Sequence, residues 1–263
     1  MQLLLGFLLA LIIAFLAYKA RSLNQSGAVA AAFTGTIIFG IGGWQWAILL
    51  LTFFITSSAL SRAFKNRKAK LEEKFSKGHE RDAGQVFGNG GIATLFAALH
   101  FFYPNEVWVW AAFAASLAAV NADTWATELG VLNPNPPRMI TNLTKVVEKG
   151  TSGGISLVGT LASLAGSALI AFLASLLTGN WSLFLVVSIA GLAGSLFDSF
   201  LGGTVQAMYF CPKDQKETEK HPLHTCGTET VHLRGWKWLN NDIVNFSCGV
   251  FGVVVSLLLL GIF

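Results

Sequence analysis

The chain has 263 residues, of which 53% are hydrophobic and only 12% are charged, and its net charge is +4. A soluble domain carries about twice that charged fraction, and a single domain of this length cannot hide so much apolar surface from water. A soluble globular protein is therefore excluded, and lipid is the expected solvent. The length suits one transmembrane domain, 1–263, with no second domain of ordinary size.

The N-terminal apolar run, residues 2–18, has two interpretations. A signal peptide carries its positive charge before the apolar run. Here Lys19 and Arg21 follow the run, and no Lys or Arg precedes it. We therefore expect a retained first membrane span.

Further apolar runs follow along the whole chain. A spanning helix needs about 20 apolar residues, so we predict an all-α, multi-pass integral membrane protein with eight spans. The seventh span contains four glycines, and we expect it to be tilted or interrupted. The predicted spans lie near residues 2–19, 26–43, 44–62, 83–103, 107–127, 154–178, 181–208 and 242–262.

The basic residues indicate the orientation. All 18 Lys and Arg fall in alternate connections of this order, whereas the turns near Gly42, Pro104 and Gly179 contain none. Because cytoplasmic loops collect Lys and Arg, we expect both termini on the non-cytoplasmic side and the polar loops, including 205–241, in the cytoplasm. In a bacterium or archaeon this membrane would be the inner (plasma) membrane. The charges thus indicate orientation and contacts with membrane lipids, and not a nucleic-acid partner.

The basic stretch 61–77 has two interpretations of its own. It either orients the chain near anionic lipid headgroups or helps to hold an anionic substrate.

Acidic side chains stand within or at the ends of the predicted spans, where they are costly and therefore usually functional. Asp82 and Asp242 each open a span, so helix capping is the alternative for both. Asp123 and Asp198 do not open a span, and a buried charge needs a partner or a metal. We expect these two to bind Mg²⁺, with Glu128 as a further ligand or as an orienting residue.

Amide side chains accompany these carboxylates. Helical spacing puts Asn89 on the face of Asp82, and Asn245 on the face of Asn241 and Asp242. We predict that these residues contact nucleotide or phosphate. The small residues around them also suit plain helix packing.

A loop rich in Gly, Ser and Thr precedes the sixth span. Backbone N–H groups that enter a helix N-terminus bind anions, although the spacing here is not that of a P-loop, and a glycine-capped linker is the alternative. Beside carboxylates that can hold Mg²⁺, we favour a phosphate site. Its predicted members are Lys145, Lys149, Gly150, Thr151, Ser152, Gly153 and Gly154.

Another group of metal-ligating residue types lies in the loop 205–241. Cys211, Asp214, His224 and Cys226 resemble a zinc hook in which Asp214 takes the second position of a C-x2-C pair. We expect either a zinc site or an ordered loop with reduced thiols. The odd number of cysteines in a long chain argues against a disulfide scaffold.

Several motifs together carry a family resemblance. The segments DAGQVFGNGG, NADTWATELG, EKGTSGG, SLFDSFLGGTVQ, HTCGTET and GWKWLNNDIVNF resemble the integral membrane family that contains phytyl-phosphate kinase. The pattern Asp123-x2-Ala126-x3-Gly130, followed by Lys145-x2-Glu148-x-Gly150, is similar to the signature of CTP-dependent polyprenol kinases and phosphatidate cytidylyltransferases. The chain departs from these patterns at Glu148-Lys-Gly, where polyprenol kinases tend to have Glu-Gly, and at Asp214, a position that is often Cys.

The resemblance implies transfer of a phosphoryl group from CTP, or another nucleoside triphosphate, to an isoprenyl monophosphate of the phytyl or geranylgeranyl type. In that reaction Asp123, Glu128, Asp198 and Lys149 would be catalytic, since phosphoryl transfer depends mostly on positioning and charge neutralisation. A transporter of a polar or anionic solute is an alternative, because glycine-rich helices and intramembrane carboxylates suit it. A lipid-phosphate cytidylyltransferase is another. The sequence supports no particular oligomeric state.

Overall fold

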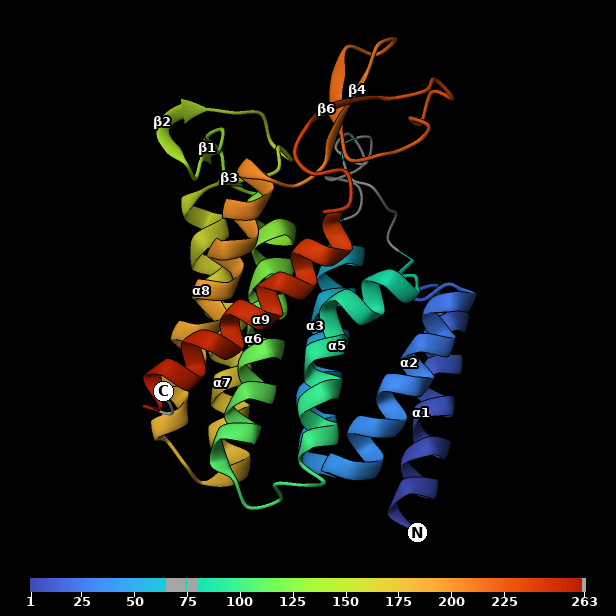
Figure 1. Ribbon diagram of the computed structural model, residues 1–263, viewed down its shortest axis with the longest axis vertical. Coiled ribbons are helices and arrows are strands. Elements are labelled where there is room, and N and C mark those ends of the chain that lie inside the picture. Colours follow the sequence, from blue (N-terminus) through green and yellow to red (C-terminus); the bar gives the residue numbers. More distant parts are fainter. Residues whose placement is uncertain (65–73, 75–79, 262–263) are drawn as a thin grey trace.

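The computed structural model describes residues 1–64, 74 and 80–261. Most of the predicted basic stretch 61–77 lies outside the described residues. Within them the helices form a bundle, and the strands lie together at one end of it, opposite the N-terminus (Figure 1). The helices are α1 Gln2–Lys19, α2 Gln25–Ile37 with the π-helix η1 Ile38–Gly42, α3 Trp44–Ala63, α5 Ala83–Leu99, α6 Val107–Gly130, α7 Leu157–Thr178, α8 Ser182–Thr204 and α9 Asn241–Leu259.

The first helix packs through small residues and exposes large ones. Its buried positions are Gly6, Ala10, Ala14 and Ala17, spaced about one helical turn apart. A Cβ at Gly6 would lie 2.6 Å from the backbone nitrogen of Gly40, so the two backbones touch here. Small residues permit such close approach between membrane helices. The large side chains of α1 are left to face lipid.

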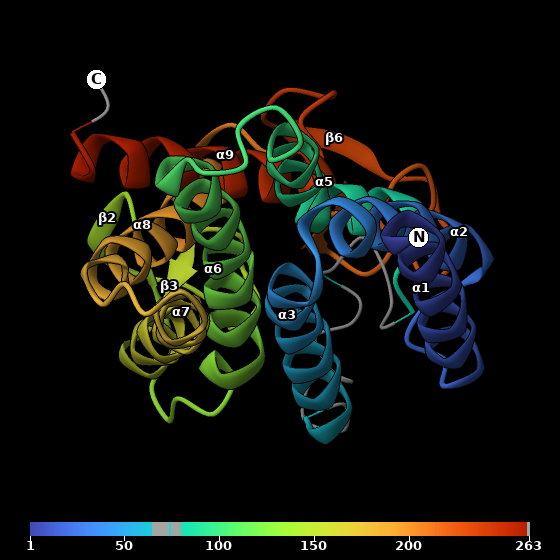
Figure 2. The same cartoon turned by 90° about the horizontal axis from the view of Figure 1, so that it is seen from below.

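Helix α6 occupies the middle of the bundle and contacts α3, α5, α7, α8 and α9 (Figure 2). Every residue between positions 111 and 122 is buried, and most of them are Ala or Ser. The fully buried Asn121 donates to the carbonyl of Gly166 on α7 at 2.7 Å and accepts from Thr56 on α3 at 3.2 Å. One polar side chain therefore links three helices.

In the part of the chain that the structure describes, six helices are long and apolar enough to cross a membrane: α1, α2 with η1, α3, α7, α8 and α9. Helices α5 and α6 lie in the same bundle (Figure 1); α5 has only 17 residues, and α6, with 24 residues, is largely buried among the other helices. The mostly helical, multi-span architecture is confirmed. The count of eight spans and the sidedness of the termini remain predictions.

The prediction of a purely α-helical chain is wrong for the two longest connections. They form three-stranded antiparallel sheets in the orders β2-β1-β3 and β5-β4-β6. Strands this short give no periodic signal in the sequence. Their pairing satisfies the hydrogen bonds of backbone N–H and C=O groups outside the helices. The strands are β1 Arg138–Met139, β2 Asn142–Val146, β3 Gly154–Ile155, β4 Met208–Cys211, β5 Lys216–Thr218 and β6 Val231–Arg234.

The glycines of the seventh span predicted that it is tilted or interrupted, and helix α8, which corresponds to it, has no interruption. Each of these glycines instead lies close to a neighbour. A Cβ at Gly191 would meet Ser167 and Ala118, and one at Gly194 would meet Ala119 and the carbonyl of Cys248. The glycines thus let α8 pack tightly against α6, α7 and α9.

Candidate functional site

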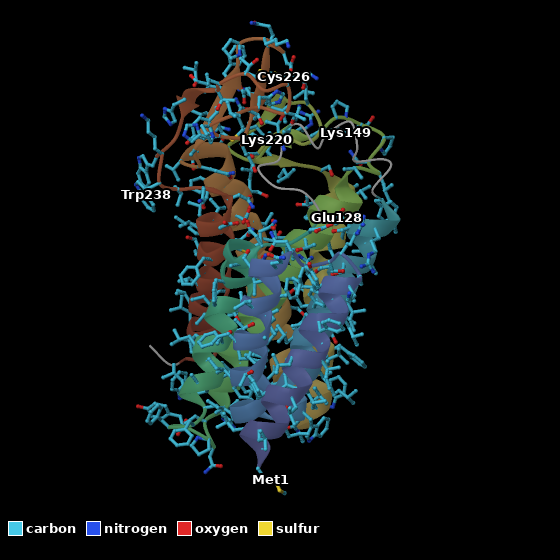
Figure 3. All side chains as sticks on the ribbon, turned by 90° about the vertical axis from the view of Figure 1, so that its right-hand side faces the viewer. Met1, Glu128, Lys149, Lys220, Cys226 and Trp238 are labelled. Atoms are coloured by element: carbon cyan, nitrogen blue, oxygen red, sulfur yellow. The ribbon has the colours of Figure 1, made fainter. Side chains whose placement is uncertain are left out.

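A cavity of about 320 Å³ opens at the strand end of the bundle. Figure 3 shows Glu128 at the end of the helices, below Lys149 in the adjoining loop. The lining is mostly polar and comes from α3, α5, α6, α7, α8, α9 and the loops that follow α6 and α8. It includes Ser61, Arg81, Gln85, Asn89, Asp123, Thr124, Glu128, Lys149, Gly150, Thr151, Ser152, Gly153, Gly154, Ser195, Asp198, Gln206, Glu219, Asn241 and Asn245.

Two predicted metal ligands, Asp123 on α6 and Asp198 on α8, line this cavity together. Their carboxylates repel each other, and that of Glu219 repels both. The Oδ2 atom of Asp198 is buried and has no hydrogen-bond partner among the described residues. Several negative charges around one cavity fit the binding of a cation.

Glu219 is a site residue that the sequence motifs did not identify. It directly follows β5 and lines the cavity. Its Oε1 atom accepts hydrogen bonds from Ser152 Oγ at 2.7 Å and from Gln206 Nε2 at 2.9 Å. Because its placement depends on the pairing of β5 with β4, no local sequence pattern pointed to it.

The predicted phosphate loop lines the cavity from Lys149 to Gly154. The N–H groups of Thr151 and Gly154 bond to carbonyls within the loop, at Glu148 and Thr151. Gly153 has a φ of +86°, and a Cβ there would lie 2.3 Å from the Cα of Gly203 on α8. Glycine is therefore required where the loop meets α8.

The two lysines of this loop differ in position. Lys149 donates to the carbonyls of Val131 and Asn133, at 3.2 and 2.6 Å, and so ties the loop to the end of α6. Such a cation also suits the negative end of a helix dipole. Lys145 is exposed on β2 and does not line the cavity.

Lys74 joins the two extramembrane segments above the cavity. Its Nζ atom lies 2.6 Å from Glu148 Oε2, and its carbonyl accepts from the backbone N–H of Glu219 at 2.8 Å. The hydrogen bond and charge of Lys74 lower the pKa of the exposed Glu148 carboxyl. Lys74 thus contacts both the phosphate loop and the Glu219 segment.

Arg81, which the sequence motifs also missed, stands just before α5 and lines the cavity. Its guanidinium donates to Ser58 Oγ at 3.1 Å and lies over the rings of Phe53 and Phe54. Burial lowers its pKa to about 10 and the carboxylate of Glu128 opposes that shift, so the charge is kept at neutral pH. Glu128 itself is buried and accepts from Ser61 Oγ at 2.7 Å.

Of the two acidic residues at helix starts, Asp82 is a cap, whereas the cap of α9 is Asn240 and not Asp242. The Asp82 carboxylate accepts from the backbone N–H of Gln85, and the backbone N–H of Asp82 donates to Gln85 Oε1, which forms a capping box for α5. Asp242 lies in the first turn of α9. Neither Asp82 nor Asp242 lines the cavity, whereas the predicted amides Asn89, Asn241 and Asn245 do.

A second, apolar cavity of about 80 Å³ lies between α1, α2, α3 and α5. It shares Arg81, Gln85 and Asn89 with the polar cavity, so the two spaces border the same side of α5. Its other lining residues are Ala10, Ile13, Ala14, Ala17, Leu23, Ala31, Thr34, Gly35, Phe39, Leu50, Leu51, Phe53, Phe54, Val86 and Gly90. We call it the apolar slot.

The four residues of the predicted zinc hook come together outside the bundle. One ligand atom from each of Cys211, Asp214, His224 and Cys226 lies within 4.8 Å of the others. The thiols of Cys211 and Cys226 are free. Hydrogen bonds from Thr228 and His224 lower the pKa of the Cys226 thiol to about 7.

Comparison with known proteins adds the evolutionary context. Protein PGR of Arabidopsis thaliana is 33% identical over 271 residues, which cover 93% of this chain and 91% of that protein. An uncharacterized membrane protein of Methanocaldococcus jannaschii is 36% identical, covering 76% of this chain and 82% of that protein. Protein VTE6, chloroplastic, of Arabidopsis thaliana is 24% identical, covering 90% and 65%.

No solved structure matches the chain. The family model described as integral membrane protein DUF92 matches residues 8–253. This match spans the bundle and all the lining residues of the polar cavity. The chain is therefore an integral membrane protein and belongs to the DUF92 family.

Proposed function

We propose that this protein is a Mg²⁺-dependent kinase that transfers a phosphoryl group from CTP, or another nucleoside triphosphate, to an isoprenyl monophosphate. One observation carries the proposal: carboxylates from α6, α8 and the end of β5 share one cavity with a glycine-rich loop. That cavity also borders an apolar slot. A polar cavity next to an apolar slot suits a reaction between a nucleotide and a lipid phosphate.

Asp123 and Asp198 are the residues that would hold Mg²⁺, with Glu219 beside them. Their mutual repulsion and the buried Oδ2 of Asp198, which lacks a hydrogen-bond partner in the described part of the chain, fit a divalent cation. Mg²⁺ is usually bound by one or two carboxylates together with substrate phosphates. When bound, it would neutralise charge on the transferred phosphoryl group.

The loop 149–154 is the candidate site for the nucleotide phosphates. Its glycines hold the backbone close to the cavity, and Ser152 and Thr151 add hydroxyl groups there. Lys149 positions the loop through the carbonyls at the end of α6 and adds positive charge. Asn241 and Asn245, from the start of α9, supply amide groups to the same cavity.

Arg81 is the candidate anchor for the acceptor phosphate. Its guanidinium borders both cavities, so a phosphate there would leave the attached chain beside the apolar slot. Arginine binds phosphate oxygens through paired hydrogen bonds, and Glu128 helps to hold this charge in place. An acceptor that is already a phosphate also needs no strong general base. The sequence resemblance to a family containing phytyl-phosphate kinase favours an isoprenoid chain.

A transporter and a cytidylyltransferase remain the rival functions. Transporter sites lie near the bilayer midplane, between helices that open alternately to both faces. Here the polar cavity lies at the strand end of the bundle. A cytidylyltransferase would use a similar set of residues but would attack the α-phosphate of CTP.

Product analysis tests the proposal. The purified protein in detergent is incubated with Mg²⁺, a prenyl monophosphate and CTP labelled at either the α- or the γ-phosphate. We expect the γ-label in an isoprenyl diphosphate, with CDP as the second product. Appearance of the α-label in lipid, with pyrophosphate, would instead indicate cytidylyl transfer. No lipid product with any nucleoside triphosphate would contradict the proposal.

A further inference from the structure

The Cys/His cluster of the β4–β6 lobe, residues 205–240, takes no part in the proposed reaction. Cys211 ends β4, Asp214 lies in the turn that follows, and His224 and Cys226 lie in a second turn. Cys211 and His224 are buried, whereas Asp214 and Cys226 are half-buried. Four side chains able to bind a metal ion thus come from two turns that are separate in the sequence.

The spacing of the ligand atoms agrees with a tetrahedral zinc site. Zinc binds sulfur at about 2.3 Å and nitrogen at about 2.05 Å, so tetrahedral geometry puts two sulfurs about 3.8 Å apart and a sulfur and a nitrogen about 3.5 Å apart. The Sγ atoms of Cys211 and Cys226 are 3.6 Å apart. The Nδ1 atom of His224 lies 3.5 Å from Cys226 Sγ.

The fourth ligand position is provided by Asp214. Its Oδ2 atom lies 3.0 Å from His224 Nδ1, whereas two ligands of this kind around zinc would be about 3.4 Å apart. The shorter distance is that of a direct hydrogen bond, which an ion between the two groups would replace. Cys211 Sγ also accepts from the backbone N–H of Asp214 at 3.5 Å, as outer hydrogen bonds commonly do for a metal-bound sulfur.

We propose that Cys211, Asp214, His224 and Cys226 bind one structural zinc ion. Two thiolates select a soft, tetrahedral metal over Mg²⁺ or Ca²⁺. A site with four protein ligands leaves no open position for substrate, which indicates a structural role and not a catalytic one.

The ion would stabilise the segment that carries Glu219. Cys211 pairs with Lys216, and Tyr209 pairs with Thr218, so β4 aligns β5 directly before Glu219. The zinc would join the end of β4 to the turn around His224. This joins the two sides of the lobe and keeps β5, and therefore the Glu219 carboxylate, at the polar cavity.

Metal analysis of the full chain tests this proposal. Protein expressed with zinc in the medium is purified in detergent and analysed by inductively coupled plasma mass spectrometry. We expect about one zinc ion per chain, because a four-ligand site holds one ion. Cys211→Ser should lower the zinc content at least about tenfold, because even the loss of a residue that only orients a ligand weakens metal binding by about 10- to 100-fold. Cys248→Ser, a matched thiol change in α9, should keep it.

Three further measurements keep the test decisive where Cys211→Ser fails to fold. Asp214→Cys should keep the zinc and resist chelators at least as well as the wild-type protein, because thiolate binds zinc strongly. Co²⁺ exchanged into the wild-type protein should give the visible d–d absorption of a tetrahedral thiolate site, and chelation should speed proteolysis within 206–240. A metal-free wild-type protein, or zinc retained in Cys211→Ser, would overturn the proposal. Neither result depends on kinase activity.

Discussion

At the scale of single residues, Asp198 places a carboxyl group where burial and two neighbouring carboxylates disfavour its charge. It lines the cavity at the strand end of the bundle, near two other carboxylates, and one of its oxygens has no hydrogen-bond partner in the described residues. A charge in such surroundings destabilises the fold unless a cation is bound. Residues of this kind are retained when function requires them.

Replacement of this residue separates function from stability. Asp198→Asn keeps the shape of the side chain but removes its charge. We expect kinase activity to fall about 100-fold or more, the range seen when a key electrostatic group of an active site is lost. Without Mg²⁺, the thermal unfolding temperature should stay the same or rise, because the repulsion from Asp123 and Glu219 is relieved.

The control for this change is Glu106→Gln, at the exposed start of α6 on the far side of the bundle. It should change neither activity nor stability. Full activity in Asp198→Asn would show that the metal site is assigned to the wrong residues.

Arg81 gives a second prediction at this scale. Arg81→Gln should raise the KM for the prenyl phosphate by about 10- to 100-fold, as expected from a lost hydrogen bond to a charged group of about 1.5–3 kcal/mol. The KM for the nucleotide should change little. Arg81→Lys keeps the charge but loses the planar guanidinium group. Its KM for the prenyl phosphate should therefore lie between those of the wild-type protein and Arg81→Gln.

Steady-state kinetics with each substrate varied in turn checks this prediction. Arg138→Gln, on the exposed strand β1, is the matched control. An equal rise in both KM values would mean that Arg81 acts on the whole cavity and not on the acceptor.

At the scale of elements, the contact between the loop 149–154 and α8 is unusually close. Gly153 and Gly179 both have positive φ angles, +86° and +69°, but only Gly153 has a close neighbour. A Cβ at Gly179 would meet nothing within 4 Å. A substitution at Gly179 would therefore cause backbone strain alone, whereas a substitution at Gly153 would cause both backbone strain and a steric clash.

Alanine at each position measures the two effects. Gly179→Ala should lower the free energy of unfolding by about 1 kcal/mol, the strain of a left-handed residue, and leave activity intact. Gly153→Ala should lower it further and abolish activity, because the loop must move away from Gly203. Thermal unfolding in detergent and kinase assays check both variants. Equal effects of the two changes would contradict the proposed contact.

The elements also show what the sequence was able to predict. Long apolar runs predicted the helices within a few residues, because hydropathy over 20 residues is a strong signal. Helix capping was one of the two interpretations that the sequence left open for Asp82, and the structure shows this cap, whereas only packing shows that Asp198 lines the cavity. Glu219 was missed because its position depends on strand pairing between β4 and β5. Arg81 was missed because a basic residue just before a predicted span indicates only a charge in a loop.

At the scale of the whole molecule, the order of the helices predicts on which side of the membrane each loop lies. The loops around Asn105 and Asn180 lie at the end of the bundle opposite the strands (Figure 1). If α5 and α6 both span, Asn105→Cys and Asn180→Cys should react with a membrane-impermeant maleimide in intact cells. Lys145→Cys should react only after permeabilisation.

Wild-type protein gives the background from the native thiols in this experiment. Labelling at 180 but not at 105 would show that α5 and α6 do not cross the membrane. Labelling of Lys145→Cys in intact cells would reverse the predicted orientation.

The small size of the apolar slot has a consequence for selectivity. At about 80 Å³, it has room for only the first few carbons beyond a phosphate held at Arg81. The rest of a long hydrocarbon tail would extend into the bilayer, where every additional methylene finds the same surroundings. Under the proposed function, the protein would distinguish its substrates by the headgroup and by branching near the phosphate. The number of isoprene units farther along the tail would have little effect on binding.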